Sequence, residues 1–160
     1  MKVKTIVDER FEDYKDLSMF VCSNTCDWKC CREAHIPVSI CQNSGISQKE
    51  AVEVTPQEMF DRYISNPFSK ALVFGGLEPM LQFNEMIDVI KYFRNHDCDD
   101  TIVIYTGYYK DEIADKITIL QDYKNIIVKF GRYKPNSEKR FDEVLGVELI
   151  SSNQYAEKIS

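Results

Sequence analysis

The sequence predicts an α/β fold in one domain, with a parallel sheet that forms a partial (β/α) barrel. Short apolar, β-branched runs recur along the chain, and segments of helical periodicity separate them, as in successive βαβ units. The 160 residues suit one domain that spans residues 1–160. A complete eight-unit barrel needs about 250 residues, so this chain can close only part of one or form an open sheet.

The strands are predicted from apolar runs that are too brief for helices. The strongest runs are SMFV, ALVF, TIVIYT and IIVKF, and a weaker one is VELI. Continuous apolar runs of this kind are typical of parallel strands, which are buried on both faces. In chain order the runs occupy residues 18–21, 71–74, 101–106, 126–130 and 147–150.

Three helices are predicted between these strands. Thr55 can cap the first, because Pro56 suits the first helical position and Glu58 completes a capping box. Apolar residues at spacings of three and four predict a second helix over 83–93 and a third over 113–120. Strands and helices therefore alternate through most of the chain.

The composition argues against two classes of partner. A net charge of −6 and a pI near 5.0 oppose binding to a phosphate backbone, so we expect no nucleic acid. No segment resembles a signal peptide, and the apolar runs are far too short to cross a bilayer, so we expect no membrane and a cytoplasmic location. In a reducing cytoplasm, clustered cysteines favour metal binding over disulfides.

Five of the six cysteines lie within residues 21–43, directly after the first predicted strand. Cys26 and Cys30 are separated by three residues and can face one metal centre, with Cys41 returning as a third ligand. Three thiolates suit an iron-sulfur cluster. Zinc usually takes four ligands, so spacing alone leaves zinc open, as it does a simple packing role. The stretch holds three candidates to complete a zinc site: Cys22, Cys31 and His35.

Glycine-containing segments follow the other predicted strands. In GGLEP, Gly75 and Gly76 let the backbone approach a ligand closely, Glu78 adds an acceptor and Pro79 fixes the turn. TGYY follows the third strand and GRYKPN follows the fourth. Because the carboxyl ends of parallel strands lie at one edge, these segments and the cysteines are expected to gather on one rim.

In this order the segments resemble landmarks of the radical SAM superfamily, specifically of the small activating proteins of anaerobic ribonucleotide reductases. That family has a three-cysteine loop whose last cysteine is followed by an aromatic residue and often Asn, comparable to Cys41-Gln42-Asn43. Its later landmarks are a Gly-Gly-Asp/Glu-Pro strand end, a Tyr-Thr-Gly-Tyr strand end, a Gly-Arg-Phe-like segment and a Ser-Ser-Asn-Gln segment. The comparable segments here are residues 75–79, 105–108, 131–133 and 151–154.

Two features differ from the family's pattern. The family's cysteines are usually spaced by three and then two residues, which no set here obeys, and Leu77 interrupts the Gly-Gly-Glu-Pro run. On the resemblance we interpret the spacing as an insertion, which makes Cys26, Cys30 and Cys41 the ligands. The alternative set is Cys22, Cys26 and Cys30, with equal gaps of three, and it leaves Cys41 as a packing thiol.

The resemblance implies a 4Fe-4S cluster in which one iron has no protein ligand and binds the amino and carboxylate groups of S-adenosylmethionine. Gly75 and Gly76 would then present backbone acceptors to the methionine ammonium group. Glu78, followed by Pro79, would hold that group or order the turn. Further cofactor contacts are implied at four residues: Asn43, Thr106, Gly107 and Asn153. The cysteines expected to be structural are Cys31 and Cys98.

The same resemblance implies a cytoplasmic activase. Reductive cleavage of S-adenosylmethionine would give a 5'-deoxyadenosyl radical, which abstracts hydrogen from a glycine of an anaerobic ribonucleotide reductase. The electron donor would be a protein such as flavodoxin or ferredoxin. A chain this small leaves few residues for a lid, which favours a macromolecular substrate. Two alternatives stay open: radical chemistry on another peptide or small molecule, and a non-enzymatic, zinc-stabilised interaction module.

Overall fold

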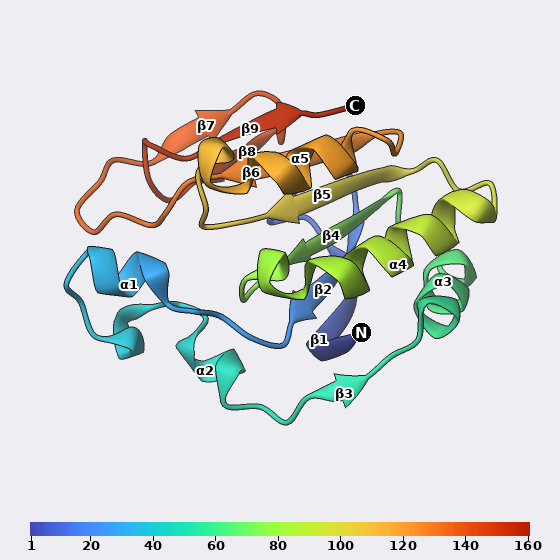
Figure 1. Cartoon of the computed structure of the whole chain (residues 1–160), viewed down its shortest axis with the longest axis horizontal. Helices are drawn as coiled ribbons and strands as arrows, with labels where there is room; N and C mark the ends of the chain where they lie inside the picture. The colour runs from blue at the N-terminus through green and yellow to red at the C-terminus, as the bar shows by residue number, and fades with distance from the viewer.

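A seven-stranded sheet in the order β3-β1-β2-β4-β5-β6-β9 runs through the computed structural model, which describes residues 1–160 (Figure 1). Its four central strands run parallel, because each pairs with the next in the same direction. The four strongest apolar runs of the sequence thus form the parallel strands, as predicted. These strands are β2 (Ser18–Ser23), β4 (Ala71–Gly75), β5 (Thr101–Tyr105) and β6 (Ile126–Phe130).

The predicted parallel sheet is only the central part of a mixed sheet, because three outer strands are antiparallel. β1 (Lys2–Arg10) and β3 (Val52–Glu53) extend one side, and β9 (Tyr155–Lys158) pairs with β6 on the other. The sheet is therefore mixed. Its edge strands, β3 and β9, each pair with one neighbour only, so the sheet does not close into a barrel. These outer strands are partly exposed to solvent and contain charged residues. They therefore lack the continuous apolar runs by which the central strands were predicted.

The weak fifth run also has a different place from the one predicted. Val147–Leu149 forms β8, which pairs only with β7 (Arg140–Asp142) in a separate two-stranded sheet. The buried carboxylate of Asp142 anchors this hairpin. It accepts hydrogen bonds from the amides of Val144, Leu145 and Ala156 at 2.9–3.1 Å. The hairpin is thereby tied to β9 at the sheet edge.

All three predicted helices form. α3 (Pro56–Ser65) begins with the expected capping box, in which Thr55 Oγ1 accepts from the Glu58 amide at 3.1 Å and Glu58 Oε2 accepts from the Thr55 amide at 2.8 Å. α4 (Phe83–Asn95) and α5 (Ala114–Leu120) each follow a short 3-10 turn, η2 (Pro79–Gln82) and η3 (Lys110–Ile113). No helix is long and apolar enough to span a membrane.

The sheet is covered on both faces. The apolar sides of α3, α4 and α5 pack on one face in a core of 24 buried residues, and Figure 1 shows α4 and α5 in front of the strands. The other face carries a smaller apolar cluster, to which Tyr14 and the β7–β8 hairpin contribute. Fully buried strand residues on both faces hold the central strands in place.

The connection from β2 to α3 carries the cysteine stretch. It contains two short helices, α1 (Lys29–Glu33) and α2 (Ser44–Ser47), and a 3-10 turn, η1 (Val38–Ile40). Figure 1 shows α1 and α2 at the end of the sheet toward which the arrows of β4 and β5 point. The cysteines therefore lie at the carboxyl ends of the parallel strands, as the sequence predicts.

Candidate functional site

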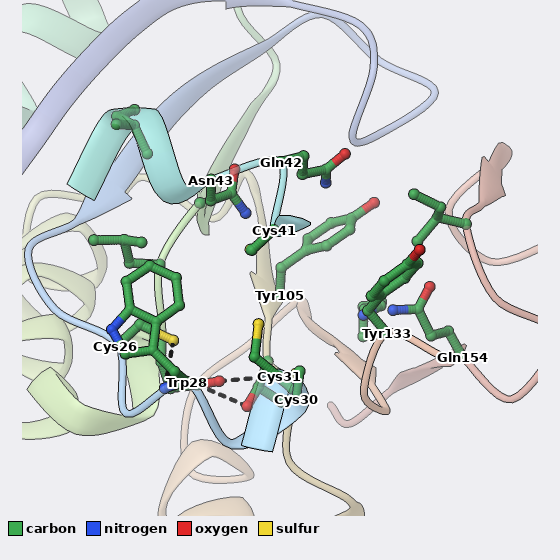
Figure 2. A pocket seen from close by; sticks show the side chains of 18 of the residues that line it. Cys26, Trp28, Cys30, Cys31, Cys41, Gln42, Asn43, Tyr105, Tyr133 and Gln154 are labelled. Carbon is green, nitrogen blue, oxygen red and sulfur yellow. Dashed lines mark hydrogen bonds between the residues drawn. The ribbon is translucent and has the colours of Figure 1, made fainter. Parts of the chain in front are cut away.

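A cavity of about 410 Å³ lies at the carboxyl ends of the parallel strands, and four cysteines line it. Cys30 and Cys31 come from α1, Cys26 precedes them, and Cys41 follows η1. Figure 2 shows Cys41 across the cavity from the helix that carries Cys30 and Cys31. The structure thus brings Cys26, Cys30 and Cys41 to one space, and it adds Cys31, which was expected to be structural.

The other two cysteines do not line the cavity. Cys22 is fully buried at the end of β2, where its Sγ lies 3.6 Å from the carbonyl oxygen of Ser23 and accepts a hydrogen bond from the amide of Leu77. Cys98 follows α4 and packs beside the helical core. The alternative set therefore combines two cavity thiols with one core thiol.

Three of the cavity thiols favour the neutral form in the metal-free chain. Burial raises the pKa of the Cys26 thiol to about 12, and it also raises the pKa values of Cys30 and Cys31. The Trp28 amide donates to Cys26 Sγ at 3.3 Å, an interaction drawn in Figure 2, although Trp28 has a left-handed backbone with φ 58°. Metal binding at these thiols must therefore release protons.

Two of the predicted glycines are required by close packing against sulfur. A Cβ on Gly107 would lie 2.9 Å from Cys30 Sγ, and the amide of Tyr133 donates to the same sulfur. Gly76 has a left-handed φ of 73°, and a Cβ there would overlap Cys22 Sγ. Both glycines line the cavity, whereas Gly75 lies outside it between Phe20 and Tyr105.

Glu78 joins the ends of two strands. Its side chain is buried; Oε1 accepts from Thr106 Oγ1 at 2.7 Å and from the Met80 amide at 3.1 Å, and Oε2 accepts from the Gly107 amide at 2.9 Å. Burial raises the pKa of this carboxyl, and the three hydrogen bonds oppose that rise. Of the two roles implied for Glu78, these contacts favour ordering the turn.

The remaining predicted residues divide between the cavity and its surroundings. Asn43, Glu78 and Thr106 line the cavity, whereas Pro79 starts η2 outside it. Asn153 also lies outside the lining, and its Nδ2 donates to the carbonyl oxygen of Arg132 at 2.9 Å. Asn153 thus acts through the backbone of the segment after β6.

A network of charged side chains fastens α1 to the strand ends. Arg132 donates from Nη1 and Nη2 to the two oxygens of Glu112 at 2.7 and 2.5 Å, and its Nε lies 2.8 Å from Glu33 on α1. Lys29, also on α1, pairs with Glu112 at 2.5 Å. The Arg132 guanidinium also lies 4.7 Å from the centre of the Tyr109 ring. We call Lys29, Glu33, Glu112 and Arg132 the α1 clamp, because they link the helix bearing Cys30 to the loops after β5 and β6.

Three charged residues that line the cavity were not among the predicted site residues. Lys129 on β6 is buried, and burial lowers its pKa to about 8. Arg10 and Asp13 form an ion pair at 2.8 Å, and burial raises the pKa of Asp13 to about 6 against the effect of Arg10. A lysine inside the apolar run IIVKF was the available signal for the first, whereas Arg10 and Asp13 lie in a charge-rich segment that reads as solvated.

No three His, Cys, Asp or Glu side chains in the structure lie close enough together to share one metal ion. The donor set nevertheless fits an iron-sulfur cluster chemically, because thiols from several sides face one cavity and Gly107 leaves room beside Cys30. A cluster is larger than one ion, so its cysteine ligands could come from separate walls of the cavity.

A comparison with models of protein families identifies the family of the chain. The model of a family described as a 4Fe-4S single cluster domain matches residues 17–155, which include every cysteine and all the strand ends around the cavity. No curated protein and no solved structure matches the chain.

Proposed function

The chain belongs to the family of 4Fe-4S single cluster domains, and from this premise we propose that it is a radical SAM activase. Its activity would be the reductive cleavage of S-adenosylmethionine to generate a glycyl radical on an anaerobic ribonucleotide reductase. The observation that carries this proposal is the meeting of the cavity thiols with the glycine-containing ends of β4 and β5. The landmarks that resemble the activase family in sequence thus lie around one space.

Within this proposal, Cys26, Cys30 and Cys41 are the cluster ligands. All three line the cavity, whereas Cys22 is engaged in the core by the Leu77 amide. Cys31 lines the same cavity, where burial and then the neighbouring Cys41 thiol raise its pKa, and it is the alternative to Cys41 as third ligand. A 4Fe-4S cluster held by these three residues would leave one iron without a protein ligand, and it would supply the electron for cleavage of the sulfonium nucleotide.

The chain's own residues would bind and orient that nucleotide. Gly76 brings backbone to the cavity wall without a side chain, as an acceptor for the methionine ammonium group requires. Asn43 and Thr106 offer polar side chains on two other walls. We further propose that the mixed sheet is a partial barrel whose open side admits the partner's glycine loop, with flavodoxin or ferredoxin as electron donor in the cytoplasm.

Anaerobic reconstitution tests the proposal. Iron and sulfide should bind at about four each per chain, and a reductant should then yield 5'-deoxyadenosine from S-adenosylmethionine. Zinc without sulfide, with no adenosyl cleavage, would instead establish the zinc-stabilised interaction module. Cleavage without a glycyl radical signal on a reductase would leave the radical chemistry and refute the partner.

Single alanine variants choose the ligand set. Cys41→Ala should lose iron, while Cys22→Ala should retain it, because only Cys41 lines the cavity. Cys98→Ala is the matched control, since Cys98 is a partly buried thiol beside the helical core. Loss of iron in Cys22→Ala together with retention in Cys41→Ala would overturn the assignment in favour of the alternative set.

Radical chemistry on a small molecule is the second candidate, and Arg10 and Asp13 favour it. This ion pair also lines the cavity, together with the ring of Phe20, over which the Arg10 guanidinium lies at 4.4 Å. A charged pair against an aromatic wall suits a polar small substrate. Turnover of 5'-deoxyadenosine stimulated by a small molecule, but not by a reductase, would decide for this candidate.

A further inference from the structure

Lys129 is a buried cation that makes no ion pair. Lys129 pairs with Tyr105 of β5, whose ring packs against the smaller apolar cluster, so its side chain lies on the face of the sheet opposite the helices. The residue is 6% exposed. Nζ donates to the carbonyl oxygen of Gly131 at 3.0 Å and lies 5.7 Å from the centre of the Tyr105 ring. An ammonium group has three donors, so one carbonyl leaves it largely unsatisfied.

No nearby group forms an ion pair with this charge. The carbonyl oxygen of Gly131 is shared with Gln154 Nε2, which donates to it at 3.2 Å. The carboxylate of Glu78, also on the cavity wall, accepts from three other donors and makes no ion pair with Lys129. Burial lowers the pKa of Lys129, and the more distant charge of Glu78 offsets only part of that effect. A buried charge without a partner opposes folding, so its retention requires another source of stabilisation.

The cavity beside Lys129 is where negative charge would be placed. Lys129 and Cys30 line the same space, and the two strand ends nearest them contribute Gly107 and Gly131, which have no side chains to fill it. Cys30 bound to iron is a thiolate, and a 4Fe-4S cluster with cysteine ligands is a net anion. A cluster-bound amino acid would add a carboxylate in the same space.

We propose that Lys129 is an anion-binding residue, whose ammonium group binds negative charge held beside Cys30. The inference rests on the proposed function, and the anion has two possible sources: the cluster with its thiolates, or the carboxylate of an amino acid bound to the open iron. In either case the charge that is unpaired in the metal-free chain becomes paired in the loaded one.

Three substitutions isolate the charge. Lys129→Met removes the charge and the donor, Lys129→Gln keeps a donor for Gly131 without charge, and Lys129→Arg keeps the charge. Lys158→Met is the control, since Lys158 is an exposed lysine of the neighbouring strand β9. In the metal-free protein we expect Lys129→Gln to raise the melting temperature, because it removes an unpaired buried cation and retains the hydrogen bond. A merely structural lysine would instead give a lower melting temperature.

The loaded protein distinguishes the two anions. If the anion is the cluster, its midpoint potential without any nucleotide should be more negative in the two neutral variants than in wild type and Lys129→Arg, because reduction adds negative charge. If it is the carboxylate, the neutral variants should bind methionine roughly tenfold more weakly, the loss of one charge-assisted hydrogen bond, and should bind 3-(methylthio)propylamine unchanged.

The outcomes keep this inference separate from the proposed function. A wild-type protein that takes up no iron and sulfide would refute the proposed function itself. A wild type that loads normally, with neutral variants that match it in both potential and methionine affinity, would refute only the role of Lys129.

Discussion

The α1 clamp gives a quantitative prediction through Glu112. Glu112→Gln removes the negative charge that pairs with Arg132 and Lys29 and keeps the size of the side chain. Arg132, whose side chain is 5% exposed, would retain only Glu33 as a charged partner. The variant should therefore be less stable, with α1 less firmly held against the strand ends.

The pKa of Glu112 sets the magnitude. Hydrogen bonds from Arg132 are the largest cause that lowers this pKa, from the usual 4.5 to about 2. A difference of about 2.5 pKa units corresponds to about 3.4 kcal/mol of stability. The side chain is 25% exposed, so water screens the pair and we expect about 2 kcal/mol.

The pH dependence has a definite sign. Because the folded pKa lies below the unfolded one, the stabilisation is present above pH 4.5 and is lost as the pH falls toward 2. The difference in free energy of unfolding between wild type and Glu112→Gln should be about 2 kcal/mol at pH 7 and about 0.4 kcal/mol at pH 3. Urea unfolding of the metal-free chain, followed by circular dichroism across this range, measures both values.

The control is a pair of similar chemistry on the surface. Glu148 and Lys139 lie 2.8 Å apart with 57% and 65% of their side chains exposed, so Glu148→Gln should leave the free energy of unfolding at pH 7 nearly unchanged. A difference between wild type and Glu112→Gln that stays constant from pH 7 to pH 3 would refute the reasoning, since it would locate the effect in packing and not in the ion pairs.

Three further substitutions follow from the packing. Gly107→Ala should abolish iron uptake while the chain still folds, because the new Cβ meets Cys30 Sγ at 2.9 Å; Gly45→Ala, with nothing within 4 Å, should load like wild type, and equal iron content in both would contradict this. Asp142→Ala leaves three buried amides without their acceptor and should lower the free energy of unfolding by about 3 kcal/mol, a loss that urea unfolding would reveal. Thr55→Ala should cost about 1 kcal/mol by removing the cap of α3, and an unchanged denaturation midpoint would show that the capping box contributes nothing.

The parts of the fold that the sequence predicts correctly are those with strong local signals. The four parallel strands are continuous apolar runs, and α3 carries its own start signal in Thr55, Pro56 and Glu58. β1 and β9 gave no such signal, because a strand at or near a sheet edge mixes charged and apolar residues and its pairing depends on distant partners. Local sequence patterns therefore could not predict that antiparallel strands flank the parallel ones.

The candidate site shows the same division. Cys26, Cys30, Cys41 and the cavity glycines were predictable, because thiols cluster in the sequence and glycine stands at the ends of β4, β5 and β6. Cys31 was expected to be structural. The α1 clamp was not, since Lys29 and Glu33 are 83 and 99 residues from partners that only the fold brings near. Of the charged residues at the site, only Lys129 has a signal in the local sequence, because it is a lysine within an apolar strand.

Leu77 and Cys22 lie together in the structure. Each belongs to one of the two departures from the activase pattern, the interrupted Gly-Gly-Glu-Pro run and the unusual cysteine spacing. Leu77 is buried in the smaller apolar cluster, which also contains Cys22, and its amide donates to Cys22 Sγ. Gly76 turns with a positive φ against the same sulfur, so that Glu78 still reaches the amide of Gly107. On the proposed ligand set, a cysteine at the end of β2 is free to become a core residue because Cys41 supplies the third thiolate. The cavity is then bounded, opposite the helix that carries Cys30, by Cys41 and the segment after η1.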